Sequence, residues 1–313
     1  MKCFRFIRAE KANHPVSLLC RLLGVSRAGF HAWERRAPSQ RALHDAWLVE
    51  QIRAIHRRSR ETYGSPRVHA ELRRQGVRIG RKRAERLMRA TGFSGSQRRR
   101  KGKTTIRVQG VRVACDLVDR NFVADEPNRL WMSDIKEIAT WEGKLYLASV
   151  IDCFSRRVVG WSMREHMRAE LVVEALEMAV ARRRPATGLI AHSDQGSQYV
   201  SLVFGQRCRQ AGIAQSMGSR GDCYDNAVCE SFHASLEKDL LRRRSLRTRQ
   251  EARTAVFDYI EVFFNRERLH STLGYRSPEE YERDQERSDC ASGTDDQIFI
   301  EEQVFIEEQA RAA

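Results

Sequence analysis

The chain has 313 residues, of which 41% are hydrophobic, and this is enough for two or three domains with a sizeable core. Its net charge of +15 predicts a polyanionic partner. No stretch approaches the roughly 18–20 apolar residues that a membrane-spanning helix needs, and the N-terminus is too charged for a signal peptide. These observations argue against a membrane protein and predict a cytoplasmic one.

The charge is distributed unevenly along the chain. Residues 1–113 carry 29 basic against 7 acidic residues, whereas residues 114–278 carry 24 basic and 22 acidic residues. Residues 279–313 have 3 basic and 12 acidic residues. Because Lys and Arg bind phosphate backbones, most phosphate contacts are expected in the first third of the chain. The alternative is a set of arginine-rich helix faces that are exposed to solvent.

The eight cysteines show no zinc-binding pattern. No two of them form a Cys-X-X-Cys pair, and the histidines are not spaced to complete a zinc site. We therefore interpret them as reduced thiols of a cytosolic protein.

Residues 15–36 predict two short helices around a turn. The first helix ends near Gly24, Ser26 is the predicted N-cap of the second, and Phe30 lies on the inner face of that second helix. This pattern is typical of a helix-turn-helix, with Arg27 as a candidate DNA contact. An ordinary helical hairpin fits the pattern equally well, and only the basic context favours DNA.

A second helical unit is predicted over residues 41–93. Its first helix is expected at 44–57, and Ser65 is the predicted N-cap of the next helix, with Pro66 at the first helical position. A third helix opens with three basic residues that are candidate DNA contacts: Arg81, Lys82 and Arg83. This unit is either a second helix-turn-helix or a helical spacer with a solvated arginine face.

The segment 94–119 is predicted to be a linker. It begins with small residues and a basic cluster, and it has no apolar periodicity. Such a segment can order along a phosphate backbone or stay flexible, and its candidate DNA contacts are Arg98, Arg99 and Arg100. At the other end of the chain, residues 286–313 predict an acidic, low-complexity tail.

From about residue 120 the pattern changes to mixed strands and helices. Three consecutive strands are expected first, followed by helix, strand, helix, strand and helix. The strands are expected at 130–138, 144–155, 156–163, 188–194 and 213–218. The helices are expected at 169–183, at 200–211 and from 225 to about 243. This order predicts an α/β protein with a ribonuclease-H-like fold, preceded by an all-α region.

Three carboxylates are candidate catalytic residues. Asp134 lies inside an apolar strand, where a carboxylate is costly to bury unless it is paired, hydrated or metal-bound. Asp194 ends another strand, and open α/β sheets collect ligands at strand ends. Glu230 lies on the last predicted helix of the sheet region. Taken singly, they have ordinary explanations as a strand-edge acid, a turn cap and a solvent-facing helix residue.

The three carboxylates together predict a metal site. Acids from separate elements of one α/β domain can converge on hard divalent cations. Two Mg²⁺ ions roughly 3.5–4 Å apart would hold the attacking and leaving oxygens of an in-line phosphoryl displacement.

The motifs around these carboxylates resemble a known family. WMSDI, HSDQGSQY and DNAVCESF resemble the three catalytic motifs of DDE transposases related to retroviral integrases, and 35 residues separate Asp194 from Glu230, as is typical there. The block NRERLHSTLGYRSPEEYE at 265–282 is similar to the C-terminal signature of the second-frame (OrfB) transposases of the insertion sequence three family. The resemblance covers about residues 15–282.

The resemblance implies a function and site residues. The chain would be a transposase whose catalytic residues and metal ligands, for two Mg²⁺ ions or Mn²⁺ in their place, are Asp134, Asp194 and Glu230. It would nick double-stranded DNA at an element end, and the freed 3′-hydroxyl would attack a second phosphodiester in the target. Further DNA-facing residues would be Gln198, Asn226 and Lys238.

Two positions depart from the family pattern. Many relatives carry Lys seven residues after the glutamate, where it contacts DNA, but this chain has Glu237 there, followed by Lys238. A shift of one residue rotates the cation by about 100° around a helix. Lys136 stands where threonine is common after Asp-Ile.

The resemblance also implies partners. Second-frame products are commonly fused by frameshifting to an upstream OrfA protein that brings a helix-turn-helix and a leucine zipper, and this chain has no long heptad run of its own. An OrfA protein or fusion is therefore expected, together with a homo-oligomer on DNA, because two element ends must be brought together. The expected location is the bacterial cytoplasm, in association with the nucleoid.

Two other functions remain open from the sequence. A catalytically silent DNA-binding regulator derived from a transposase is compatible with Glu237 and the acidic tail. A purely hydrolytic nuclease of the ribonuclease H type does not explain the paired N-terminal units or the block at 265–282. The predicted organisation is a helix-turn-helix-like unit (1–40), a second helical DNA-binding unit (41–93), a basic linker (94–119), a ribonuclease-H-like integrase catalytic core (120–285) and an acidic tail (286–313).

Overall fold

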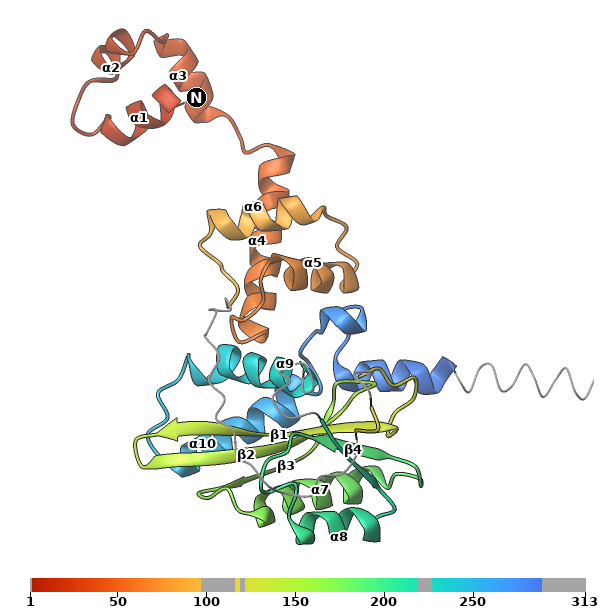
Figure 1. The fold of residues 1–313 in the computed structure, drawn as a ribbon. Helices are drawn as coiled ribbons and strands as arrows, with labels where there is room; N and C mark the ends of the chain where they lie inside the picture. The colour runs from red at the N-terminus through yellow and green to blue at the C-terminus, as the bar shows by residue number, and fades with distance from the viewer. Residues whose placement is uncertain (1, 97–115, 119–121, 219–226, 289–313) are drawn as a thin grey trace, which may run out of the picture.

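The structure, a computed structural model, describes residues 2–96, 116–118, 122–218 and 227–288. Two helical units are followed by an α/β core (Figure 1). Four residues named above, and most of the predicted acidic tail, lie outside the described residues: Arg98, Arg99, Arg100 and Asn226. Within the described part of the chain, no helix has both the length and the apolar character needed to cross a membrane.

The first helical unit contains the predicted pair of helices and one helix that was not predicted. The helices are α1 (Lys2–Glu10), α2 (Val16–Leu22) and α3 (Arg27–Arg35). Gly24 has a φ of +64°, which glycine adopts without strain, and the Ser26 hydroxyl accepts a hydrogen bond of 3.0 Å from the Gly29 amide. Phe30 is fully buried against α1. The sequence pattern did not predict α1. The apolar face of α1 packs only within this small cluster.

The second helical unit consists of α4 (Gln40–Arg58), α5 (Ser65–Arg74) and α6 (Arg81–Ala90). The predicted N-cap of α5 is wrong by one residue. Gly64 is the N-cap, Ser65 is the first helical residue, and the Ser65 side chain does not cap the helix. Because proline needs no hydrogen-bonded N–H in the first turn, Pro66 is tolerated at the second position as well as the first.

All five expected strands are present and form one mixed sheet. Their order is β3-β2-β1-β4-β5, in which β1 and β2 and also β2 and β3 are antiparallel, while β4 runs parallel to both β1 and β5. The strands are β1 (Leu130–Thr140), β2 (Gly143–Asp152), β3 (Val158–Arg164), β4 (Ile190–Ser193) and β5 (Ala214–Met217).

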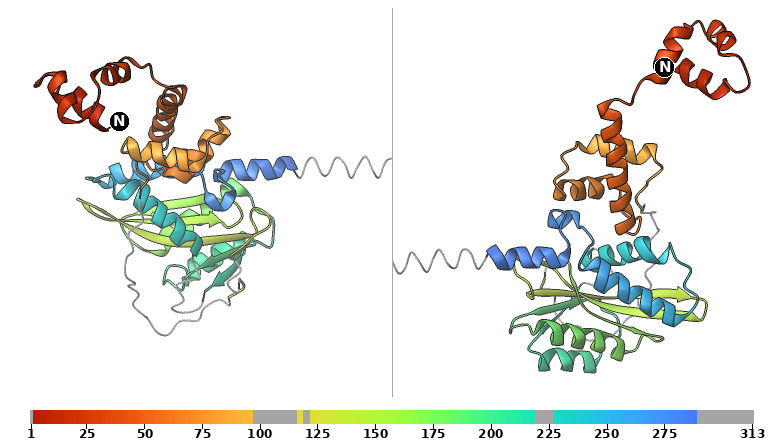
Figure 2. Two further views of the ribbon diagram at one scale, coloured as in Figure 1. Left: turned by 90° about the horizontal axis from the view of Figure 1, so that it is seen from above. Right: turned by 180° about the vertical axis from the view of Figure 1, so that it is seen from behind.

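Helices cover both faces of this sheet (Figures 1 and 2). On one face α7 (Ala169–Arg183) and α8 (Leu202–Gln210) bury an apolar cluster. Gly160 of β3 lets α7 approach closely, since a Cβ atom there would lie 2.2 Å from a carbonyl oxygen of α7. The other face carries α9 (Ala227–Leu236) and α10 (Arg249–Phe257). Apolar strand residues therefore face helices on both sides, which accounts for their nearly continuous apolar character.

The C-terminal helices continue into irregular turns. A π-helical segment, η1 (Glu237–Leu241), extends α9, and another, η2 (Asp258–Phe264), extends α10. A short 3-10 turn, η3 (Ser271–Leu273), precedes a final helix over residues 278–288.

The second helical unit packs directly on the core. The Tyr63 hydroxyl donates to the Glu267 carbonyl at 3.1 Å and accepts from the Leu269 amide at 2.8 Å. Arg67 of α5 donates from Nε to the Leu269 carbonyl at 2.8 Å. These bonds join residues about 200 positions apart, so the block at 265–282 connects the helical unit to the α/β core.

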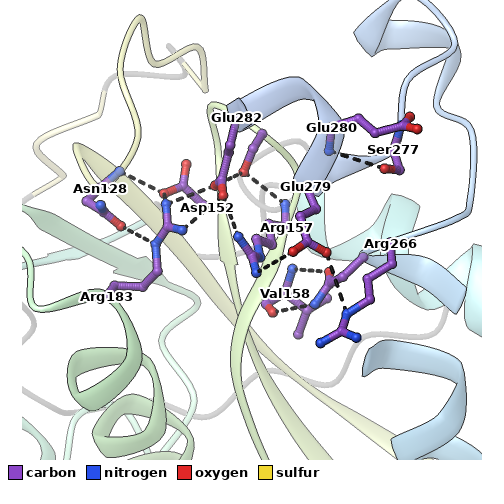
Figure 3. Close-up of polar contacts among 12 residues, drawn as sticks. Asn128, Asp152, Arg157, Val158, Arg183, Arg266, Ser277, Glu279, Glu280 and Glu282 are labelled. Atoms are coloured by element: carbon purple, nitrogen blue, oxygen red, sulfur yellow. Dashed lines mark hydrogen bonds and ion pairs between the residues drawn. The ribbon is translucent and has the colours of Figure 1, made fainter. Parts of the chain in front are cut away.

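The same block is bonded to the edge of the sheet (Figure 3). The Asn265 amide group bonds both the N–H and the carbonyl of Val158 in β3, at 3.0 and 2.9 Å. The buried Glu282 carboxylate accepts from Arg157 at 2.7 Å and from Arg183 at 2.8 Å. Burial raises the pKa of Glu282, but Arg183 and the other donors outweigh it and leave the pKa below its ordinary value.

Candidate active site

Two of the three predicted carboxylates lie where the pairing of β1 with β4 ends: Asp134 is inside β1, and Asp194 directly follows β4. Ser133 of β1 and Ser193 of β4 are the last residues paired between these parallel strands, and Asp134 and Asp194 follow them directly. Adjacent strands in a sheet lie about 4.8 Å apart. The parallel register therefore places the two aspartates at the same level of the sheet, beside the carboxyl end of β4, where open α/β sheets collect ligands.

Asp134 is held by contacts on both of its oxygens. Its Oδ1 accepts from the Ile135 amide at 2.7 Å, and its Oδ2 lies 3.3 Å from Nδ1 of His233 on α9. The other ring nitrogen of His233 lies 3.3 Å from the Ser149 hydroxyl of β2. Sequence reasoning missed His233. Its position three residues after Glu230, on the same helix face, was the available signal.

Asp194 begins the loop after β4. Its Oδ1 accepts from the Gly196 amide at 3.1 Å, and a Cβ atom on Gly196 would lie only 3.0 Å from that oxygen. The residue borders solvent, yet the pKa of its carboxyl is raised, first by loss of surrounding water and second by the negative charge of Asp134. The Gly196 bond offsets only part of this rise.

Glu230 is placed differently from the two aspartates. It lies in the first turn of α9 with its side chain exposed, one helical turn before His233. Across the residues that the structure describes, no three His, Cys, Asp or Glu side chains form a group that could hold a metal ion. The structure thus brings Asp134 and Asp194 together. Glu230 lies on α9, the helix whose His233 contacts Asp134, but its side chain does not form a metal-binding group with the two aspartates.

The two aspartates fit a hard cation. They offer carboxylate oxygens, which Mg²⁺ prefers, and the pKa of Asp194 is raised first by loss of surrounding water and second by repulsion from Asp134. Among the described residues, neither aspartate forms an ion pair with a lysine or an arginine. A divalent cation between them would offset this repulsion, and Asp134 and Asp194 are the residues that could hold it.

Buried groups lie close to this pair. Cys229 of α9 is completely buried, and the pKa of its thiol is raised well above the ordinary value by burial and then by the charge of Asp134. Tyr199 is also buried, and burial followed by the charges of both aspartates raises its pKa. Both groups therefore stay protonated, so neither is a competing ionised nucleophile beside the carboxylates. The five cysteines that the structure describes are all free thiols.

The two departures from the family pattern contact each other. Lys136, two residues after Asp134 on the same face of β1, lies with its Nζ 3.2 Å from the Glu237 carboxylate of η1. Arg242 also bonds Glu237 at 3.2 Å. Burial raises the pKa of Glu237, but the bonds from Lys136 and Arg242 outweigh it and lower the pKa overall. The two residues that depart from the family pattern thus form an oppositely charged pair beside the site.

Exchanging these charges tests whether they act as a pair. Lys136→Glu alone is expected to lower the free energy of unfolding and the cleavage rate, because it places two carboxylates together beside Asp134. The double variant Lys136→Glu with Glu237→Lys is expected to recover both in part. A double-mutant cycle measured by chemical denaturation should give a coupling of about 0.5–1 kcal/mol, as for other partly exposed pairs. Strictly additive single effects would contradict the pairing.

The other predicted DNA contacts have different surroundings. Arg27, Arg81 and Lys82 are exposed at the start of α3 or α6. Arg83 instead bonds Asp45 of α4 at 2.8 Å, so its charge is already engaged within the helical unit. The Gln198 amide donates to the Met167 carbonyl at 2.8 Å and so connects the loop after β4 to the segment before α7.

Comparison with known families gives three matches along the chain. Models of an integrase core domain match residues 124–223 and 211–278, and a model of an HTH-like domain matches residues 43–101. The integrase core matches confirm the fold class that was predicted from the order of strands and helices.

Curated relatives cover nearly the whole chain. Transposase InsF for insertion sequence IS3A of Escherichia coli (strain K12) is 37% identical over 279 residues, which are 88% of this chain and 97% of that protein. The transposase for insertion sequence element IS629 of Shigella sonnei is 37% identical over 87% of this chain and 93% of its own. The insertion element IS600 uncharacterized 31 kDa protein of Shigella sonnei is 40% identical over 83% and 96%.

Solved structures with a similar arrangement are more distant. The catalytic core domain of BIV integrase is 20% identical, with a TM-score of 0.40, over 52% of this chain and 98% of that chain. A chain of the simian T-cell lymphotropic virus intasome is 14% identical, with a TM-score of 0.43, over 74% of both chains. From the integrase core and the extent of identity to curated relatives, it follows that this chain belongs to the IS3 family of insertion-sequence transposases.

Proposed function

We propose that this chain cuts DNA at the ends of an insertion sequence and joins them to target DNA with Asp134, Asp194 and Glu230 as its catalytic carboxylates. The observation that carries the proposal is the pair of aspartates at one level of the sheet, where the parallel pairing of β1 with β4 ends, in an integrase core. The raised pKa of Asp194 beside Asp134 marks this pair as a place of unbalanced negative charge.

The residues of the chain have separate roles in this proposal. Asp134 and Asp194 would hold Mg²⁺, with Glu230 joining them from α9. When bound, Mg²⁺ polarises a phosphodiester and favours ionisation of a hydroxyl nucleophile. His233 orients Asp134 from α9, and the Gly196 amide orients Asp194. Because Asp134 is held on both of its oxygens and Asp194 on one, both carboxylates are oriented before substrate arrives.

DNA binding is proposed to begin at the helical units. Their exposed basic residues at helix N-termini and the HTH-like match at 43–101 support contact with a DNA backbone. A homo-oligomer would bring two element ends together, and an OrfA protein or fusion would add end recognition. Mixing the chain with OrfA and measuring complex mass on DNA tests this part.

Strand transfer with labelled element-end DNA and Mg²⁺, with and without OrfA, tests the catalytic proposal. Asp134→Asn and Asp194→Asn should each remove joined products, as should a chelator, while DNA binding persists. Asp284→Asn, which changes an exposed aspartate of the final helix, is the matched control and should join DNA normally. Wild-type protein that binds DNA but never cuts it would instead favour the catalytically silent regulator.

A further inference from the structure

A cavity of about 470 Å³ lies where the second helical unit meets the α/β core. It is lined by residues from the start of α5, from the segment after α6, from η1 and from the block at 265–282. Its polar side chains include Ser65, Arg67, Ser96, Lys238, Ser271 and Tyr275. Neither the catalytic carboxylates nor Lys136 line it, so it is separate from the active site.

Two cations, Lys238 and Arg67, line this cavity, and neither forms an ion pair with an acidic side chain among the described residues. Lys238 forms no ion pair within the described residues, and its neighbour Ser96 bonds only its backbone carbonyl, at 2.9 Å. Arg67 uses Nε on the Leu269 carbonyl and lies over the Tyr63 ring at 5.7 Å. The nearby acid Asp239 is already bonded to the buried Arg268 at 2.8 Å. The cavity therefore holds more positive than negative charge.

The electrostatic effects on these cations agree with that excess. Burial lowers the pKa of Lys238, and Arg67 and Arg268 lower it further, although Asp239 acts in the opposite direction. Burial also lowers the pKa of Arg67, and repulsion from Arg268 adds to this. Partly buried cations that repel one another are stabilised when an anion binds between them.

The rest of the lining suits an anion with several oxygens. The hydroxyls of Ser65 and Ser271 can donate hydrogen bonds, and the N-terminal end of α5 adds its partial positive charge in the same cavity. Arginine, lysine and serine donors are those that bind backbone phosphates in protein–DNA complexes.

We propose that this cavity binds one backbone phosphate of the DNA substrate, between Lys238 and Arg67. The proposal rests on the proposed function, because it takes the substrate to be DNA. Lys238 follows Glu237 on the extension of α9, the helix that carries Glu230, whereas Arg67 belongs to α5 of the HTH-like unit. A phosphate held by both fixes the distance along DNA between the recognised sequence and the cleaved bond.

Equilibrium binding of element-end DNA at several salt concentrations tests this site. Lys238→Met should weaken binding about tenfold and reduce the slope of log K against log salt by about one, since one phosphate contact is lost. Lys144→Met is the matched control, because Lys144 is an exposed lysine on β2 that pairs with Glu137 at 3.0 Å. It should leave both the affinity and the slope unchanged.

A second variant keeps the proposal testable if Lys238→Met fails to fold. Ser271→Asp changes an exposed residue at the rim, and it should weaken DNA binding by at least as much through repulsion. Equal affinities and slopes for Lys238→Met, Ser271→Asp and the control would overturn the proposal. If inorganic phosphate raises the wild-type Tm while DNA affinity is unchanged in these variants, the cavity binds free phosphate and the DNA assignment is wrong.

Failure of this proposal is distinguishable from failure of the catalytic one. The test here measures binding, which Asp194→Asn leaves intact, whereas the catalytic test measures joined products. A protein in which Asp194→Asn stops joining but Lys238→Met binds normally would keep its function and lose only the phosphate site.

Discussion

Replacement of Glu230 by glutamine is expected to lower the rate of strand transfer by about a thousandfold or more while DNA binding is retained. Glutamine keeps the size of the side chain but removes the charge that would balance divalent cations beside Asp134 and Asp194. A catalytic metal contributes several kcal/mol to transition-state stabilisation, and about 1.4 kcal/mol corresponds to tenfold in rate. Glu230 is the position that distinguishes a triad from a site of two carboxylates. Its side chain is exposed on α9 and, among the described residues, is not grouped with the aspartates.

The matched control for this variant is Glu170→Gln. Glu170, like Glu230, is an exposed glutamate in the first turn of a helix, but it lies on α7, which covers the opposite face of the sheet. The control should transfer strands at the wild-type rate. Calorimetric titration with Mn²⁺ should show weaker binding for Glu230→Gln alone. If Glu230→Gln joins DNA as fast as Glu170→Gln, the site uses two carboxylates and the triad is wrong.

Replacement of Glu282 by alanine is expected to lower the free energy of unfolding by about 3–5 kcal/mol, because it leaves buried positive charge without its partner. The Glu282 side chain is only 6% exposed and bonds both Arg157 and Arg183, as Figure 3 shows. Chemical denaturation of the full chain measures this loss. Glu279→Ala is the control, since Glu279 is 32% exposed and lies 3.9 Å from Arg157, and it should cost less than about 1 kcal/mol.

The same carboxylate should give an acid-dependent stability. Its pKa in the folded chain is lower than in the unfolded chain, so its contribution is present above the ordinary glutamate pKa and is lost as the pH falls below it. The pKa of the neighbouring Asp152 is shifted in the opposite direction, because burial raises it despite hydrogen bonds from two backbone amides. Glu282→Gln should therefore make the unfolding free energy fall less steeply below about pH 4.5. An unchanged acid profile would contradict this account.

Loss of the Glu282 contacts should also affect the helical unit. The final helix and Leu269 belong to one block, which bonds the sheet edge at Val158 and the helical unit at Tyr63. This block joins the sheet to the helical unit. A variant at Glu282 that loosens the block should therefore weaken the contact between the sheet and the helical unit. The role of the signature at 265–282 is therefore structural in the described chain.

Local patterns were sufficient for most elements of this protein, although not for α1. The helix expected at 169–183 begins and ends at those residues, since an amphipathic period and its flanking polar residues are local properties. The five strands were found for the same reason, with boundaries shifted by up to three residues. Asp134 and Asp194 could be chosen as candidates from the sequence, because each is a carboxylate inside or directly after an apolar strand. Their neighbouring positions come from the parallel pairing of β1 with β4.

Contacts between distant residues were decided only by the tertiary structure. His233 meets Asp134, Glu237 meets Lys136, and Lys238 faces α5 across a cavity. No periodicity in the chain encodes these partners, because side-chain periods record which face a residue occupies and not what lies opposite that face. The sequence by itself determined most of the elements and the basic N-terminal region, and it named the three candidate carboxylates. Packing of α9, η1 and residues 265–282 against other elements then decided which charges are paired and which remain available for DNA.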